Sequence, residues 1–184
     1  MRFNTHNDLE GTHAMFSPSQ SAWLRYDDEK IIEYHMNKRA SEIGTIYHAW
    51  AKQTIDLRIK QPKTKKTLYA YVNDAIGFQM NTEVVLKYSN KFFGTADAIS
   101  FRKRFLRIHD LKTGKHPARM EQLEIYAALF CLEYGENPED IKMELRIYQN
   151  DEVVVHVPEP EDIRVIMNRI IYIDRMLDNY DKEE

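Results

Sequence analysis

The chain has 184 residues with a net charge of −3, and its 43% hydrophobic content is enough to bury the core of one folded domain. No apolar run reaches the roughly 18 residues of a membrane helix and no signal-peptide pattern opens the chain, so we expect a soluble, cytoplasmic protein without membrane partners. The single cysteine, Cys131, excludes an internal disulfide and an all-cysteine iron–sulfur cluster within one chain.

The charge is distributed unevenly along the chain. Residues 60–119 carry 13 lysines and arginines against four acidic residues, a net charge of +9, whereas the rest of the chain carries −12. A basic region around acidic residues suits a site that cleaves phosphodiesters, because cations attract the nucleic-acid backbone and carboxylates hold a metal. The alternative is that these cations only keep loops and strand edges soluble.

The N-terminal residues 1–16 show no hydrophobic period, and we expect them to form a flexible lead-in. Ser17 and Pro18 then mark the start of a short helix, because serine can cap a helix and proline suits its first turn. The acidic residues 27–29 interrupt the apolar pattern there, and a period of 3.6 residues predicts the next, longer helix over 38–59.

Gly44 and His48 lie one turn apart on the same face of the helix predicted over 38–59. A glycine inside a helix costs up to about 1 kcal/mol relative to alanine, which suggests that another backbone or a ligand approaches closely at this point. A lone histidine on a helix is more often a structural residue than a metal ligand, and spacing alone leaves both roles of His48 open.

A basic connection that contains Lys65 and Lys66 leads into a helix predicted over 64–79. The alternating pattern that follows predicts a strand over 82–88. Glu83 lies on one face of this strand, where it is a further candidate for the acidic site formed by the next two strands.

Two alternating apolar segments predict a β-hairpin with strands over 92–101 and 105–112. Asp97 lies on the first strand and Asp110 on the second. Lys112 shares a face with Asp110, because side chains two apart on a strand point the same way. Two carboxylates beside a lysine are typical of a site for a hard divalent cation such as Mg²⁺, and a pair of salt bridges at the strand ends is the alternative. The turn of the hairpin is basic and consists of Arg102, Lys103 and Arg104.

The strongest helical pattern covers residues 118–134 and ends at Gly135, a residue suited to a helix C-terminus. Arg119, Gln122 and Tyr126 follow one another at intervals of about one turn and form a polar stripe that begins just after the hairpin. A solvated helix face is the alternative interpretation of this stripe.

The last elements are two strands predicted over 141–148 and 152–157, joined as a hairpin, and an amphipathic helix over 163–180. The order of helices, three strands, a helix, two strands and a helix predicts an α/β fold with a mixed central β-sheet of about five strands flanked by helices. We expect one domain over 1–184, which ends in a C-terminal helix and acidic tail over 161–184.

Several short motifs occur in order along these elements. They are Gly44-Thr-Ile-Tyr-His48, Glu83, Gly94-Thr-Ala-Asp97, Asp110-Leu-Lys112 and Gln122-Leu-Glu-Ile-Tyr126. Together, on the expected order of helix, strands and helix, they resemble the PD-(D/E)XK nuclease superfamily and, within it, the RecB-like and phage-type exonucleases. The resemblance extends over about residues 17–134. Ala96 takes the place of the proline in the superfamily name, a change that the RecB-like branch tolerates.

This resemblance implies a restriction-endonuclease-like core and a Mg²⁺- or Mn²⁺-dependent nuclease that hydrolyses DNA, as an exonuclease rather than an endonuclease. Its setting would be DNA recombination, repair or phage DNA processing in a bacterial or phage-infected cell. The implied partners are single- or double-stranded DNA, a helicase, recombinase or single-strand-binding protein, and further copies of the chain. Members with an iron–sulfur cluster carry several cysteines, so we expect no cluster here.

The resemblance also implies the ligands of the metal. Asp97 and Asp110 would be its carboxylate ligands, and His48 would add a nitrogen ligand from its helix. The backbone carbonyl of Leu111 would complete this set, with Glu83 as an additional ligand.

The remaining motif residues would act on the substrate. Lys112 would orient or activate the attacking water, and Gln122 and Tyr126 would position the nucleic acid or the water beside the scissile phosphate. Basic side chains around the site would contact the DNA backbone without reading its bases. These are Lys65, Lys66, Arg102, Lys103, Arg104, Lys115 and Arg119.

The sequence leaves two other functions open. A nuclease-like fold that is catalytically inactive would serve as a nucleic-acid-binding or partner-binding subunit, although such a subunit has no need of two carboxylates beside a lysine. A nuclease that acts on structural RNA is the other alternative.

Overall fold

The computed structural model describes residues 5, 7–9, 11–114 and 116–183. The chain divides into two compact units, residues 1–43 and 44–184, and the predicted site falls entirely in the second unit. Part of the predicted lead-in, residues 1–4, 6 and 10, lies outside the described residues, and η1 (Asn7–Leu9) is a short 3₁₀ turn within it. The assignment of the whole chain to one domain stays a prediction.

Aromatic side chains hold the first unit together around the short 3₁₀ segment η2 (Pro18–Arg25). Phe16 contacts Trp23 and Tyr34, with ring centroids 5.9 and 5.7 Å apart. The Trp23 indole N–H donates to the carbonyl of Ser17 at 3.0 Å. The Ser17 side chain makes no capping hydrogen bond, so the predicted serine cap is wrong.

Helix α1 (Asp28–Asp56) is continuous, whereas the sequence predicted an interruption at residues 27–29 followed by a separate helix. The Lys30 N–H donates to Asp27 Oδ1 at 2.9 Å, so Asp27 caps the helix. The next two residues are also acidic and lie in the first turn, where the helix dipole favours negative charge. These acidic residues therefore begin the helix instead of breaking it.

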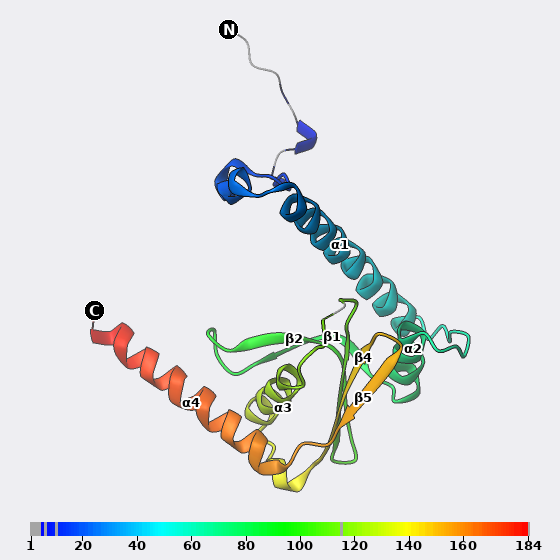
Figure 1. Cartoon of the computed structure of the whole chain (residues 1–184). Coiled ribbons are helices and arrows are strands. Elements are labelled where there is room, and N and C mark those ends of the chain that lie inside the picture. The colour runs from blue at the N-terminus through cyan, green and yellow to red at the C-terminus, as the bar shows by residue number, and fades with distance from the viewer. Residues whose placement is uncertain (1–4, 6, 10, 115, 184) are drawn as a thin grey trace. The chain divides into compact units, whose positions relative to one another are not determined.

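The second unit contains a five-stranded mixed sheet, which confirms the predicted α/β fold with a mixed sheet flanked by helices (Figure 1). The strand order follows the chain, and among its neighbouring pairs only β3–β4 is parallel. The strands are β1 (Asn81–Lys87), β2 (Phe93–Arg102), β3 (Phe105–Leu111), β4 (Lys142–Gln149) and β5 (Glu152–His156).

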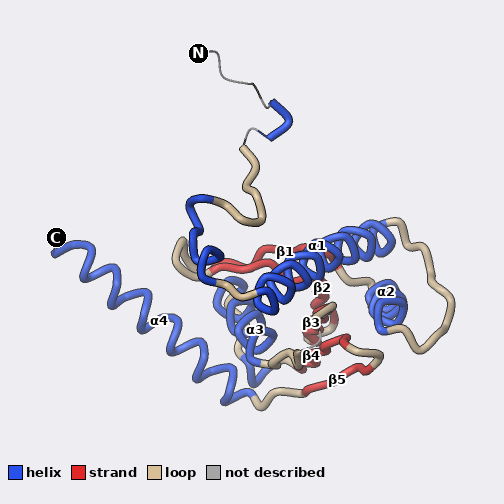
Figure 2. Tube along the Cα trace, turned by 45° about the horizontal axis from the view of Figure 1, so that its top comes forward, coloured by secondary structure: helices blue, strands red, loops and turns tan. Residues whose placement is uncertain are grey.

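Helices cover both faces of this sheet, and each face has its own buried core. Figures 1 and 2 show α2 (Thr67–Gly77) and α3 (Glu121–Tyr134) on opposite sides of the strands. The end of α1 joins α2 in one core, and α4 (Pro160–Glu183) joins α3 in the other. The core with α2 includes Ala51, Ile55, Tyr71, Val72, Ala98, Leu111 and Tyr148. The core with α3 includes Leu86, Leu106, Ile108, Leu123, Leu145 and Ile163.

Three helices start at other residues than predicted, each for a local reason. Helix α2 begins at Thr67 because Lys66 has an extended backbone. Helix α3 begins after residue 120, because the Ala118 N–H donates to the Gln149 side chain at 3.0 Å and ties this segment to β4. Helix α4 begins earlier than predicted, at Pro160, since proline suits the first helical position and acidic residues follow it.

No helix in the described part of the chain is both long and apolar enough to span a membrane.

The Asp27 cap can be tested by mutation. Asp27→Ala removes the acceptor for the Lys30 N–H and should lower the free energy of unfolding by about 1 kcal/mol. Chemical denaturation followed by circular dichroism measures this loss. Asp27→Asn retains a capping oxygen and is the matched control, so equal losses in both variants would contradict the cap.

Candidate active site

The acidic residues of the site form a row across three neighbouring strands. Asp97 and Asp110 are the next positions after the paired residues Ala98 and His109, so they face each other across β2 and β3. Glu83 falls opposite Asp97 on β1, between two residues that pair with β2. The sheet register therefore aligns three acidic positions that are separated in the sequence.

The central carboxylates are held at different depths. The Asp110 side chain is only 5% exposed, whereas the Asp97 side chain is 20% exposed. The backbone N–H of Leu111 donates to Asp97 Oδ2 at 3.0 Å. This bond crosses from β3 to β2 and fixes the position of the Asp97 carboxylate beside that of Asp110.

Helix α1 brings His48 to this pair. His48 Nδ1 lies 3.4 Å from Asp97 Oδ2. Gly44, one turn earlier, is buried, and a Cβ atom at this position would lie 2.7 Å from Thr113 Oγ1. The group that approaches Gly44 closely is thus the side chain of Thr113, just after β3, and not the backbone or ligand that the sequence suggested. Because Gly44 has no Cβ, the helix can lie close enough to place His48 beside the carboxylates.

Lys112 begins a chain of polar contacts that leads from the carboxylates to α3. Its Nζ lies 3.1 Å from both oxygens of Asp110 and donates to Gln122 Oε1 at 2.9 Å. The Gln122 amide lies 3.4 Å from the Tyr126 hydroxyl, which donates to the carbonyl of Thr95 at 2.7 Å. The predicted lysine, glutamine and tyrosine therefore form one network that starts directly after β3 and closes on β2.

Gly94 makes room for the last member of this network. A Cβ atom at Gly94 would lie 2.8 Å from Cε1 of the Tyr126 ring. Both glycines of the predicted motifs therefore allow a close packing contact, at which a larger residue would displace a neighbouring side chain.

The electrostatics of the pair reflect burial and mutual repulsion. Burial raises the pKa of Asp97, and the negative charge of Asp110 raises it further. The Leu111 N–H and the nearby His48 and Lys112 act in the opposite direction. The two carboxylates thus resist being charged together, and cations nearby offset this cost.

One oxygen of the pair lacks a hydrogen bond. Asp110 Oδ2 is buried and accepts no hydrogen bond, and its contact with the Lys112 ammonium at 3.1 Å is an ion pair. A buried carboxylate oxygen without a donor is costly. Such an oxygen fits a site that takes up a hard cation, for which carboxylates are preferred ligands.

The predicted metal ligands are brought together only in part. His48 contacts Asp97, and Asp97 adjoins Asp110, whereas Glu83 is exposed and has a left-handed backbone with φ of 52°. Among the described residues, no three His, Cys, Asp or Glu side chains are grouped closely enough to hold a metal ion. A ligand role for the Leu111 carbonyl stays a prediction.

The structure adds Tyr71 of α2, which the sequence did not identify as part of the site. Burial raises the pKa of Tyr71 well above its usual value, and the charges of Asp97, Asp110 and Glu83 raise it further. All three acids therefore lie near enough to act on one buried phenol. The sequence shows only a tyrosine at a core position of a helix, because the packing of α2 against the strands is a tertiary feature.

Sequence analysis also missed a polar network around His109, on the other face of β3. His109 is fully buried, and its Nδ1 lies 3.2 Å from the Tyr148 hydroxyl, which donates to Asp74 at 2.7 Å. Burial lowers the pKa of His109 to about 3, and the charges of Arg146 and Arg107 act in the same direction. This histidine is neutral at pH 7 and joins β3 to β4 and α2.

The predicted DNA-contacting residues are not all near the carboxylates. Arg119 lines a groove beside Lys112 and Gln122. The Arg102–Arg104 turn lies at the far end of the hairpin from Asp97. Lys103 is six residues along the chain from Asp97, which corresponds to about 20 Å at the rise of an extended strand. Lys115 lies outside the described residues.

The remaining cations of this set have local contacts. Arg104 donates to the carbonyl of Asp140 and contacts Glu136. Lys65 and Lys66 precede α2, and the Lys66 ammonium lies 5.6 Å from the Tyr69 ring. Their contact with DNA stays a prediction.

Comparisons of the sequence with protein families and with curated proteins assign no function to these residues. No protein-family model matches the chain, and no curated protein is significantly similar to it.

The Gly94 contact predicts a local loss of stability. In Gly94→Ala the new methyl group displaces the Tyr126 ring and weakens its bond to Thr95, so the free energy of unfolding should fall by about 1–3 kcal/mol. Urea denaturation measures the change. Gly77→Ala is the matched control, because the added Cβ would meet no atom within 4 Å beyond its chain neighbours and its own helix backbone, and it should leave stability unchanged or slightly raised. Equal effects at both glycines would contradict the contact.

Proposed function

We propose that this chain is a metal-dependent nuclease of the PD-(D/E)XK type, with a restriction-endonuclease-like core, that hydrolyses DNA phosphodiester bonds from strand ends. The observation that carries the proposal is the buried Asp110 carboxylate, which faces Asp97 across β2 and β3 and has the Lys112 ammonium 3.1 Å from both of its oxygens. Two carboxylates that resist being charged together, with a fixed ammonium beside them, are the groups that a metal-dependent phosphodiesterase requires.

The residues that would hold Mg²⁺ or Mn²⁺ are Asp97 and Asp110, with His48, the Leu111 carbonyl and Glu83 completing the set. Their chemistry fits, because the group is dominated by oxygen donors and carries the negative charge that a hard divalent cation requires. When bound, the metal would polarise a phosphoryl oxygen and lower the pKa of its water.

Lys112 would supply the fixed positive charge of the site. Its ammonium is held between Asp110 and Gln122, at 3.1 and 2.9 Å, so it is oriented before a substrate arrives. From there it would orient the attacking water and offset the charge that develops on the phosphate. Gln122 and Tyr126 would keep the ammonium and the nucleic acid in position, since the tyrosine is itself anchored on β2.

A second candidate is a nuclease-like subunit that binds nucleic acid or a partner without catalysis. It is favoured by the absence, among the described residues, of three closely grouped metal ligands and by the Lys112 ammonium close to both Asp110 oxygens. In the nuclease the carboxylates would bind a catalytic metal, whereas in the binding subunit they would not. The metal dependence of DNA cleavage therefore separates the two candidates.

The decisive assay incubates the protein with end-labelled linear DNA and closed circular DNA in Mg²⁺, Mn²⁺ or EDTA. We expect metal-dependent degradation of the linear substrate alone, and a loss of about 10²-fold or more in Lys112→Ala and Asp110→Asn. Lys87→Ala, which removes an exposed lysine on β1, is the control and should keep full activity.

The other outcomes decide among the alternatives. Nicking of circles would indicate an endonuclease, and faster cleavage of RNA of the same sequence would indicate a ribonuclease. No cleavage with any metal, together with salt-dependent DNA binding and no Mn²⁺ binding in calorimetry, would overturn the nuclease proposal and support the binding subunit.

A further inference from the structure

A groove of about 560 Å³ lies directly beside the Lys112–Gln122–Tyr126 network. Its polar side is lined by Lys112 and Arg119, together with Glu121. Its apolar side is lined by Phe93, Ile125 and Leu129. A volume of this size is within the range of small-ligand sites.

The apolar side of the groove is open to solvent. Phe93 is 63% exposed and Ile125 is 44% exposed, although both are large apolar residues. Phe93 directly precedes Gly94, whose contact with the Tyr126 ring fixes the start of β2 against α3. The exposed aromatic ring is therefore presented at a defined position next to the proposed catalytic residues.

The polar side offers two cations for one ligand. The Arg119 side chain is 86% exposed, and its ion pair with Glu121 is long, at 3.9 Å. Lys112 reaches the groove from the residue directly after β3, and its ammonium contacts Asp110 and Gln122. An aromatic ring beside two cations matches a nucleotide, which has an apolar base face and a negative phosphate.

We propose that this groove binds one unpaired nucleotide of a DNA strand, with its base against Phe93 and Ile125 and its phosphate at Arg119 and Lys112. The proposal rests on the proposed nuclease function, for which it names the substrate as a single-stranded or frayed end. A base inside a duplex is stacked on both sides, so its face cannot reach the ring. Single-strand binding of this kind is tolerant of sequence because every base has such a face.

Binding can be measured without hydrolysis by fluorescence anisotropy of labelled (dT)₁₂ in EDTA at fixed low salt, with a blunt hairpin duplex for comparison. Phe93→Ala should weaken (dT)₁₂ binding by about 5- to 100-fold, the range of base–aromatic stacking, and leave duplex binding nearly unchanged. Phe93→Trp keeps a stacking surface and should bind as the native protein does.

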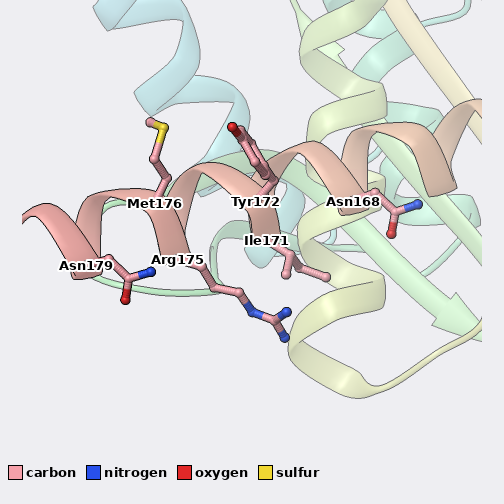
Figure 3. A pocket seen from close by; sticks show the side chains of 6 residues that line it. All are labelled: Asn168, Ile171, Tyr172, Arg175, Met176 and Asn179. Carbon is pink, nitrogen blue, oxygen red and sulfur yellow. The ribbon is translucent and has the colours of Figure 1, made fainter.

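The matched control lies in another groove that also combines an aromatic ring with an arginine. This groove, of about 520 Å³, runs along α4 and is lined by Tyr172, Met176 and Arg175 (Figure 3). Tyr172 is 58% exposed, so Tyr172→Ala removes a comparable ring away from the proposed site and should not change (dT)₁₂ affinity.

The outcomes separate this proposal from the nuclease activity itself. Native affinity in Phe93→Ala, equal losses on single strand and duplex, or no (dT)₁₂ binding by the native protein would overturn the subsite, even if the protein cleaves DNA. Selective loss of (dT)₁₂ binding would support the subsite even if no cleavage is found. Binding of an apolar peptide in place of (dT)₁₂ would show that the groove serves a protein partner.

A different observation concerns the edge strand β5, which pairs only with β4 among the described strands. Val153, Val154 and Val155 are 40–52% exposed, so this edge is apolar on both faces. Edge strands of this kind are templates for pairing with another chain, and charges or bulges usually protect them. The sequence of β5, Glu152-Val-Val-Val-His156, has an acidic residue at one end and a histidine at the other.

The ladder geometry selects one self-pairing register. A two-residue turn with positive φ at Asn150 and Asp151 joins β4 to β5, and such a turn is closed by a hydrogen-bonded pair, here residues 149 and 152. Bonded and non-bonded pairs alternate along the ladder, so Val153 and Val155 direct their backbone groups to the outer edge.

We infer that β5 pairs antiparallel with β5 of a second copy of this chain, centred on Val154. In this register the outward groups of Val153 meet those of Val155, and Glu152 lies opposite His156. His156 already contacts Glu124 at 3.0 Å on its own chain, so it would sit between two carboxylates. A carboxylate opposite an imidazole and a matched ladder are what identify a second copy as the occupant.

Cysteine crosslinking tests this register. Two Val154 positions would form a close, non-hydrogen-bonded pair, with Cα atoms about 4.5 Å apart, within the range of a disulfide. Val154→Cys should therefore give a covalent dimer under mild oxidation. Val153→Cys is the control, because its equivalent positions are diagonal, about 7–8 Å apart, and should crosslink several-fold less.

The native Cys131 is buried and present in both variants, so it contributes the same background. Equal crosslinking of the two variants, or no crosslinking together with a monomer mass for the native protein in concentrated solution by light scattering, would overturn the β5 interface.

Discussion

The central constraint in this structure is that two carboxylates, Asp97 and Asp110, face each other in a largely buried part of a β-sheet. Two negative charges in such a place repel each other and lose hydration, so neighbouring groups must compensate for both. A backbone N–H from Leu111 and the Lys112 ammonium provide part of this compensation, and His48 lies beside Asp97. One Asp110 oxygen accepts no hydrogen bond and is compensated only by its ion pair with Lys112, which links the fold to the proposed metal chemistry.

The elements that carry these groups can approach one another because two glycines remove side chains at the contacts. Gly44 lets α1 pack against Thr113, and Gly94 lets β2 pack against the Tyr126 ring. In each case a Cβ atom would come within 3 Å of a neighbouring side-chain atom. The histidine helix and the glutamine–tyrosine helix are thus positioned by packing, and the polar contacts follow from that packing.

Much of the fold could be predicted because its strands alternate clearly, and the site motifs lie on those strands. The errors have physical causes. The acidic residues 27–29 looked like an interruption, yet a helix N-terminus favours negative charge. The basic turn 102–104 is close to Asp97 in sequence, but an extended strand carries it about 20 Å away. Tyr71 looked like an ordinary core residue, because its nearness to three acids depends on how α2 packs.

The sequence by itself determined the local features of this protein: the periodic elements, the acidic pair with its lysine, and the polar stripe on α3. These depend on neighbours a few residues apart, which the chain displays directly. Only the tertiary structure decided which of them meet. The register of β1, β2 and β3 aligned Glu83 with Asp97 and Asp110, and helix packing brought in His48 and Tyr71. Long-range pairing is set by the fit of whole surfaces, so no local pattern encodes it.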